Sequence, residues 1–225
     1  TLMRSSAASD VYKRQVPDLA DSICSIYQEI RVKKTCDCQN LFDFNHVKEH
    51  IVYKLIRRDA NEELLKQIPY ESFLDLAVVY YIQIDNTRFG SAAIQIRNEH
   101  LRYWRVEKEE IRRLAEKNTP RIYPVQIRQI VRFMYVATNE QCSLGAAVMR
   151  YPDFREKVRG MIRGDFYILP SSIHEVILVP ESFGLEPERM QEMVKEINQT
   201  GVAPEEVLSD SVYYFDGEEI RIVAK

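Results

Sequence analysis

The densest group of potentially reactive side chains is the segment 171–175, with the sequence SSIHE. A serine activated by a histidine, with a carboxylate nearby, is the set of groups that nucleophilic hydrolysis uses. In known hydrolases, however, the fold brings the serine and its base together from separate parts of the chain. We therefore favour a structural interpretation, in which the Ser171 and Ser172 hydroxyls bond backbone N–H groups of a turn. A hydrolase that uses Ser171, Ser172, His174 and Glu175 is kept as the alternative.

A second candidate is Asp75, which interrupts the apolar run 73–84. A carboxyl group buried inside a strand can keep its proton and act as a general acid. Asp75 lies near the start of that run, where exposure or pairing with Arg57 or Arg58 is the simpler interpretation. Arg121, which follows a predicted helix, is a further candidate because a guanidinium can clamp a carboxylate or a phosphate. We favour a role for Arg121 in tying two lobes of the chain together.

Three patterns contain metal-binding residue types, and all of them are weak. The pair Cys36 and Cys38 lies near His46 and His50, but C-x-C is not the C-x₂-C spacing of zinc sites and no second pair matches it. His46 and His50 are four residues apart on a predicted helix and could chelate, although such pairs more often form a solvated polar face. His174 and Glu175 lack a spaced second histidine. We therefore expect no metal and no cofactor.

Composition and absent motifs exclude several common classes of protein. The chain has only 7 glycines and contains no G-x-G-x-x-G or G-x-x-x-x-G-K loop to cradle phosphates, and no H-E-x-x-H, G-x-S-x-G or C-x-x-C motif. Its net charge of −3, with both signs interspersed, makes a nucleic-acid partner unlikely, since such proteins carry a basic stripe. No apolar run approaches the roughly 20 residues that span a bilayer, so we expect no membrane partner.

Hydrophobic periodicity and turn residues predict the elements that must position these groups. We expect helices over 18–34, 45–57, 61–67, 98–104, 107–118, 152–162 and 186–198. We expect strands over 73–84, 91–96, 132–138, 144–149, 166–169, 176–179, 212–215 and 220–223. Because short turns join many neighbouring strands, the predicted fold class is α+β, with two lobes of mostly antiparallel sheet and packed helices. Pro120 and Pro124 bracket the predicted boundary between an N-terminal α+β lobe, 16–120, and a C-terminal one, 125–225.

The first residues do not look like evolved protein sequence. Residues 5–15, SSAASDVYKRQ, match the in-frame translation of a transposase sequencing adapter. Segments of this kind are left out of fold reasoning, so we exclude residues 1–15 as artefactual. We expect the native sequence to start near Val16, and the chain to be a fragment whose true N-terminus, with any targeting signal in it, has been lost.

Four segments together resemble an uncharacterised bacterial family, a domain-of-unknown-function group of the five-six-eight-eight type that is abundant in gut Firmicutes. They are 73–77 (FLDLA), 116–121 (EKNTPR), 167–178 (YILPSSIHEVIL) and 202–210 (VAPEEVLSD). The resemblance covers essentially all of residues 16–223, and its last two segments are the most specific. It implies no assigned activity, so no functional residue can be carried over. Members usually begin with an additional strand-rich segment, and Cys36 and Cys38 do not belong to the family pattern.

The expected function is therefore a non-catalytic interaction or regulatory module in the bacterial cytoplasm, known from gut metagenomic sequence. Its partner would be a protein of unknown identity. We lean against an enzyme, because the chain has neither a phosphate loop nor a spaced metal set. The hydrolase that uses the 171–175 turn remains the alternative.

Overall fold

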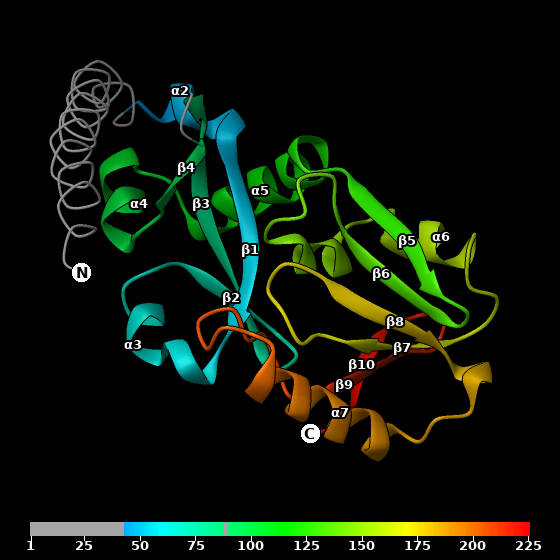
Figure 1. Cartoon of the computed structure of the whole chain (residues 1–225). Coiled ribbons are helices and arrows are strands. Elements are labelled where there is room, and N and C mark those ends of the chain that lie inside the picture. Colours follow the sequence, from blue (N-terminus) through cyan, green and yellow to red (C-terminus); the bar gives the residue numbers. More distant parts are fainter. Residues whose placement is uncertain (1–42, 88–89) are drawn as a thin grey trace, which may run out of the picture. The chain divides into compact units, whose positions relative to one another are not determined.

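The computed structural model describes residues 43–87 and 90–225 (Figure 1). The chain divides into two units, residues 1–47 and 48–225. In the first unit the short helix α2 (Phe44–Val47) follows Asp43, whose Oδ1 accepts a hydrogen bond of 2.9 Å from the Asn45 N–H. The excluded residues 1–15, the helix predicted over 18–34, and Cys36 and Cys38 lie outside the described residues.

The first sheet of the second unit is built around the long strand β3 (Leu76–Thr87). On one side β3 pairs antiparallel with β1 (Ile51–Arg57), and on the other side with β2 (Tyr70–Phe73) and β4 (Gly90–Gln95). Every side chain from Leu76 to Ile82 is buried. Such a continuous apolar run is typical of a strand that is covered on both faces.

The helix predicted over 45–57 is wrong. The 3₁₀ turn η2 (Lys48–His50) is followed directly by β1, in which every residue except Lys54 and Arg57 is buried. Because every position from Ile51 to Ile56 except Lys54 is apolar, the run fits both the helical spacing and a doubly covered strand. The β-branched and aromatic residues Ile51, Val52 and Tyr53 favour the strand, and pairing with β3 stabilises it.

The other predicted helices that fall within the described residues are confirmed, the helix over 98–104 with the predicted bounds and the rest with different ones. They are η3 (Asp59–Asn61) with α3 (Glu62–Leu65), α4 (Asn98–Trp104), α5 (Lys108–Ile122), α6 (Phe154–Arg159) and α7 (Pro187–Thr200). The predicted stop before Pro120 is wrong, because α5 continues to Ile122 with Pro120 in its last turn.

The second sheet has the order β10-β9-β7-β8-β6-β5, and all neighbouring strands are antiparallel. Its strands are β5 (Val125–Val131), β6 (Met134–Asn139), β7 (Phe166–Leu169), β8 (Val176–Pro180), β9 (Val212–Phe215) and β10 (Ile220–Ala224). The 3₁₀ turn η5 (Glu181–Phe183) follows β8. The two antiparallel sheets and the helices confirm the α+β class. No element was predicted over the residues of β5.

The strand predicted over 144–149 is wrong, since these residues begin the 3₁₀ helix η4 (Gly145–Arg150). Leu144 has a left-handed backbone, with φ of 54°, which ends the extended path. Gly145 fits tightly behind it, because a Cβ atom there would lie 2.1 Å from the Thr138 Oγ1 and 2.4 Å from the His174 carbonyl oxygen. Close approach of backbone to backbone is what a glycine permits.

Helix η4 contacts both sheets, through β1 in the first and β6 in the second. Its last residue, Arg150, lies 3.4 Å from Glu71 of β2 and 3.5 Å from Glu116 of α5. Glu71 also pairs with Arg112 of α5 at 3.1 Å. The predicted lobe boundary at residues 120–124 falls between the two sheets in sequence, and the division into two lobes stays a prediction.

The end of α5 holds the start of β1 through side-chain bonds to the backbone. Asn118 is fully buried, and its Nδ2 donates to the carbonyl oxygens of Lys48, at 2.9 Å, and of Ile51, at 3.0 Å. The hydroxyl of the next residue, Thr119, accepts a bond of 3.0 Å from the Tyr53 N–H. These bonds satisfy backbone groups along the edge of β1 that faces away from β3.

We expect Asn118→Ala to lower the free energy of unfolding by about 1–3 kcal/mol, because it removes the donor from the buried Ile51 carbonyl and from the partly buried Lys48 carbonyl. Urea denaturation of the full chain would measure this. Lys117→Ala, on the exposed side of the same helix turn, is the control and should change stability by less than about 0.5 kcal/mol. Equal stabilities of the two variants would contradict the anchoring role of Asn118.

Candidate functional site

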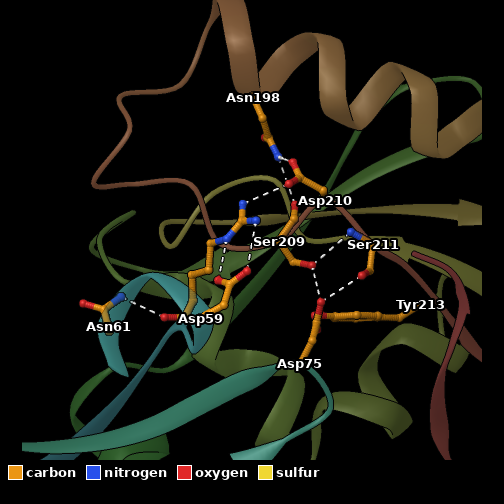
Figure 2. Close-up of polar contacts among 9 residues, drawn as sticks. Asp59, Asn61, Asp75, Asn198, Ser209, Asp210, Ser211 and Tyr213 are labelled. Atoms are coloured by element: carbon orange, nitrogen blue, oxygen red, sulfur yellow. Dashed lines mark hydrogen bonds and ion pairs between the residues drawn. The ribbon is translucent and has the colours of Figure 1, made fainter. Parts of the chain in front are cut away.

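Asp75 lies in the tight turn between β2 and β3, next to Leu74, whose φ is 57°. The strand predicted over 73–84 is confirmed from Leu76 onward as part of β3, but its predicted start is wrong, since Phe73 ends β2 and Asp75 stands in the turn. Its carboxylate accepts hydrogen bonds from Ser209 Oγ at 2.7 Å, from Ser211 Oγ at 2.8 Å and from the Tyr213 hydroxyl (Figure 2). The turn of the first sheet is therefore bonded to β9 of the second sheet and to the segment before it.

The hydroxyl groups around Asp75 are buried and directed at the carboxylate. Ser209 and Ser211 are each 2% exposed, Tyr213 is fully buried, and Ser209 Oγ also accepts the Ser211 N–H at 2.9 Å. Burial, and next the charge of Asp75, raise the pKa of the Tyr213 phenol well above its usual value, so that Tyr213 remains a donor. Three hydroxyl donors suit an ionised carboxylate, which can only accept. This arrangement favours a structural role for Asp75.

A chain of charged groups continues beside this cluster. The Arg57 guanidinium bonds Asp59 at 2.8 Å and Asp210 at 2.9 Å. Asn198 Nδ2, from α7, donates to Asp210 Oδ1 at 2.8 Å and to the Ser209 carbonyl oxygen at 3.0 Å (Figure 2). Asp75 was expected to pair with Arg57 or Arg58; instead it is bonded to hydroxyls, and Arg57 serves other carboxylates.

A pocket of about 260 Å³ opens between these groups, and its wall carries both signs of charge. The charged side chains in its wall include Arg57, Arg58, Lys195, Asp59, Asp75 and Asp210. A pocket of this size admits a small polar molecule or water. Because its acids are already bonded within the protein, we assign it no chemistry.

The 170–175 turn runs beside the segment that leads into Ser209. Ser172 and Val207 form an antiparallel bridge, and the Ile173 N–H donates to the Glu206 carbonyl at 2.9 Å. On the other side of the bridge, the Leu208 N–H donates to the Ser171 carbonyl at 3.1 Å. The two segments on which the family resemblance most depends are thus paired with each other.

His174 uses both ring nitrogens in contacts with groups other than a serine. Its Nδ1 accepts a bond of 3.2 Å from the Leu144 N–H, and its Nε2 lies 3.2 Å from Glu206 Oε1. The proton of the neutral ring therefore belongs on Nε2. Ser172 Oγ accepts the His174 backbone N–H at 3.1 Å, as the structural interpretation of this turn expects. Glu175 is half-buried just before β8.

The structure brings some predicted residues together and leaves others apart. The Ser171–His174 turn is connected to Asp75 indirectly, since it pairs with the backbone just before Ser209. Arg121 lies elsewhere, where its Nη2 donates to the Glu49 carbonyl at 2.9 Å, so it ties α5 to η2 and not one lobe to another. His46 lies in α2 and His50 in η2.

Sequence reasoning missed Ser209, Ser211 and Tyr213 as partners of Asp75. A signal was present, because the polar triplet Ser209-Asp210-Ser211 stands directly before the apolar strand 212–215. Over residues 43–87 and 90–225, no group of three or more His, Cys, Asp or Glu side chains could hold a metal ion. Within the same residues, no helix combines the length and apolar character needed to cross a membrane.

Comparison with known proteins gives one result. A family model described as "Family of unknown function (DUF5688)" matches residues 8–134 and 131–217, which is most of the chain. No curated protein and no solved structure matches.

We expect Asp75 and Tyr213 to be energetically coupled. In a double-mutant cycle of Asp75→Asn and Tyr213→Phe, the coupling in the free energy of unfolding should be about 1–3 kcal/mol, since the residues share a partly buried, charge-assisted hydrogen bond. The matched control replaces Tyr213→Phe by Tyr214→Phe. The Tyr214 hydroxyl bonds Asp165 and Glu181 instead, so this cycle should be additive within about 0.5 kcal/mol. Additivity in both cycles would contradict the role of Asp75 in joining the β2–β3 turn to β9.

We also expect stability to fall above pH 10. Burial holds the pKa of Tyr213 above the value of 10.0 that a free phenol has, so the folded chain keeps a proton that the unfolded chain releases. The protonated Tyr213 phenol makes its full contribution to the free energy of unfolding below pH 10. Above pH 10 that contribution falls by about 1.4 kcal/mol per pH unit. Urea denaturation between pH 8 and 11 should give a shallower loss for Tyr213→Phe. Tyr103→Phe, which changes a side chain that is 64% exposed, should keep the wild-type slope.

Proposed function

Given that the chain belongs to a family of unknown function, DUF5688, we propose its role from its surface: a non-catalytic interaction module that docks a partner protein at the exposed end of β5. We place this module in the cytoplasm. The four cysteines lack the spacing of a disulfide framework, which favours a reducing compartment. The bacterial gut origin and the fragment status stay predictions.

The observation that carries the proposal is the exposure of the second half of β5, the last strand of its sheet (Figure 1). All residues from Arg128 to Val131 are exposed, whereas Val125 to Ile127 are half-buried. Successive residues of a strand point to opposite faces. Neither face of this end is therefore covered, although Ile130 is 53% exposed and Val131 is 56% exposed.

Two exposed aromatic residues extend this apolar area. Phe133, in the turn between β5 and β6, is 38% exposed, and Phe183 of η5 is 49% exposed. Their ring centroids are 5.8 Å apart. We call Ile130, Val131, Phe133 and Phe183 the β5 patch. Of these four, Phe133 and Phe183 are in contact, and Ile130 and Val131 are exposed on the adjoining strand end. Exposed apolar side chains at a sheet edge are typical of an interaction surface, since such an edge otherwise favours aggregation.

The contacts of the two acid–base candidates support a non-catalytic role. His174 is engaged by Leu144 and Glu206, and Asp75 by three hydroxyl groups. Both side chains thus stabilise the join between segments far apart in the sequence. The hydrolase alternative remains a prediction, and its simplest test is turnover of ester substrates by wild type and by His174→Ala.

To test the proposal, a photo-reactive benzoyl-phenylalanine would replace Phe133 in the full chain, produced in cells of the organism that carries the gene. We expect a discrete cross-linked product with a second protein. Adding Val131→Arg should remove this product, because a guanidinium in the middle of the β5 patch opposes apolar docking.

The same photo-reactive residue at Tyr103, which is 64% exposed on α4, is the matched control and should not give that product. Identical products from both positions, or a product that survives Val131→Arg, would count against the proposal. The thermal midpoint of Val131→Arg must remain close to that of wild type for the comparison to hold.

A further inference from the structure

We infer that the partner at β5 is an extended protein segment with acidic side chains, which adds to the second sheet as a further strand. This inference rests on the proposed function and names the kind of partner. Three features of β5 carry it: the open edge, the position of its bulge and its charge.

The outer edge of β5 is open for backbone pairing. Within residues 48–225, β5 ends the order of its sheet and pairs on one side with β6. The outer edge of β1 is partly used, because the Tyr53 N–H there is bonded to Thr119. Both end strands of the second sheet have a bulge and contact a helix, α7 for β10 and α6 for β5. What sets β5 apart is that all of its residues from Arg128 to Val131 are exposed. An unpaired edge with free N–H and C=O groups is the template for strand addition.

A bulge divides β5 into two functional parts. The pairing with β6 shifts between Gln129 and Val131, so Ile130 is the extra residue. Bulges bend and twist a strand, which limits regular pairing to the part before them. We therefore assign backbone pairing to Val125–Gln129 and apolar anchoring to the β5 patch beyond it.

The charge of this region selects the partner. In residues 125–135 the charged side chains are Arg128 and Arg132, both exposed, although the chain as a whole has a net charge of −3. The Arg132 guanidinium lies 4.9 Å from the centroid of the Phe133 ring, so a positive charge stands at the β5 patch itself. Carboxylates on an incoming segment would complement both arginines.

The same charge argues against a second copy of this chain as the partner. Antiparallel pairing of two β5 strands about their middle residue would place Arg128 opposite Arg128. Like charges that face each other across a strand pair are destabilising. The partner is therefore a different, acidic segment.

Three fluorescent peptides of about eight residues would test this. One alternates Val with Glu and ends in Phe, the second has Lys in place of Glu, and the third repeats the first with alternate backbone amides methylated. By fluorescence anisotropy at low salt, the full chain should bind the Glu peptide about tenfold more tightly than the Lys peptide. Methylation should abolish binding, because it removes the donors of the added strand.

Arg128→Glu with Arg132→Glu is the charge-swap variant, and it should prefer the Lys peptide. Arg128→Gln with Arg132→Gln should bind the Glu and Lys peptides with equal affinity. If the charge-swap variant fails to fold, this neutral variant tests the role of the two arginines in its place. Arg113→Glu, which changes an exposed arginine of α5, is the matched control and should keep the wild-type preference.

Equal binding of the methylated peptide, no binding of the Glu peptide, or an unchanged preference after the charge swap would overturn strand addition. If the cross-link at position 133 persists in that case, the interaction module stands and only the kind of partner is wrong. Sedimentation of the chain with anionic lipid vesicles, lost in Val131→Arg, would assign the β5 patch to a membrane surface and overturn both proposals.

Discussion

A carboxylate held between two sheets must have its oxygens bonded, because a half-buried charge without partners costs several kcal/mol. Asp75 meets this constraint with hydroxyl groups that all come from the start of β9 and the residues before it. These bonds form only if the β2–β3 turn places Asp75 beside residues 209–213. They also require Tyr213 to lie on the side of β9 that faces Asp75. One side chain thereby bonds the two sheets to each other, together with the Arg57–Asp210 ion pair and the contacts of η4 with β1 and β6.

Polar side chains bonded to distant backbone groups fix the remaining joins as well. Asn118 and Thr119 hold the edge of β1, and His174 receives the Leu144 N–H at the turn before η4. Apolar packing gives most of the stabilisation of a fold of this size, but it is not directional. The directional bonds select one arrangement of well-packed elements from its alternatives. This explains why the polar segment 171–175 bonds the backbone of other segments in the fold.

The fold class and most helices could be predicted from the sequence, because α6 has an apolar face formed by Phe154 and Val158 and α7 begins at Pro187. Prediction failed where periodicity is ambiguous. The run from Ile51 to Ile56 satisfies a helix and a buried strand equally, and pairing with β3 decides between them. The Asp75 cluster could not be predicted, since its members are brought together by sheet topology and not by spacing. Its polar triplet at 209–211 was visible, but the partner of that triplet was not.

The bonds to Asp75 join residues that are 134, 136 and 138 positions apart in the sequence. A growing chain leaves the ribosome from its N-terminus, so the β2–β3 turn is made long before its partners exist. During that interval the first sheet lacks the hydrogen bonds from residues 209–213. Contacts between residues so far apart in the sequence form late and slowly in folding. The nascent chain therefore depends on local pairing within β1–β4 to persist until Tyr213 has been synthesised.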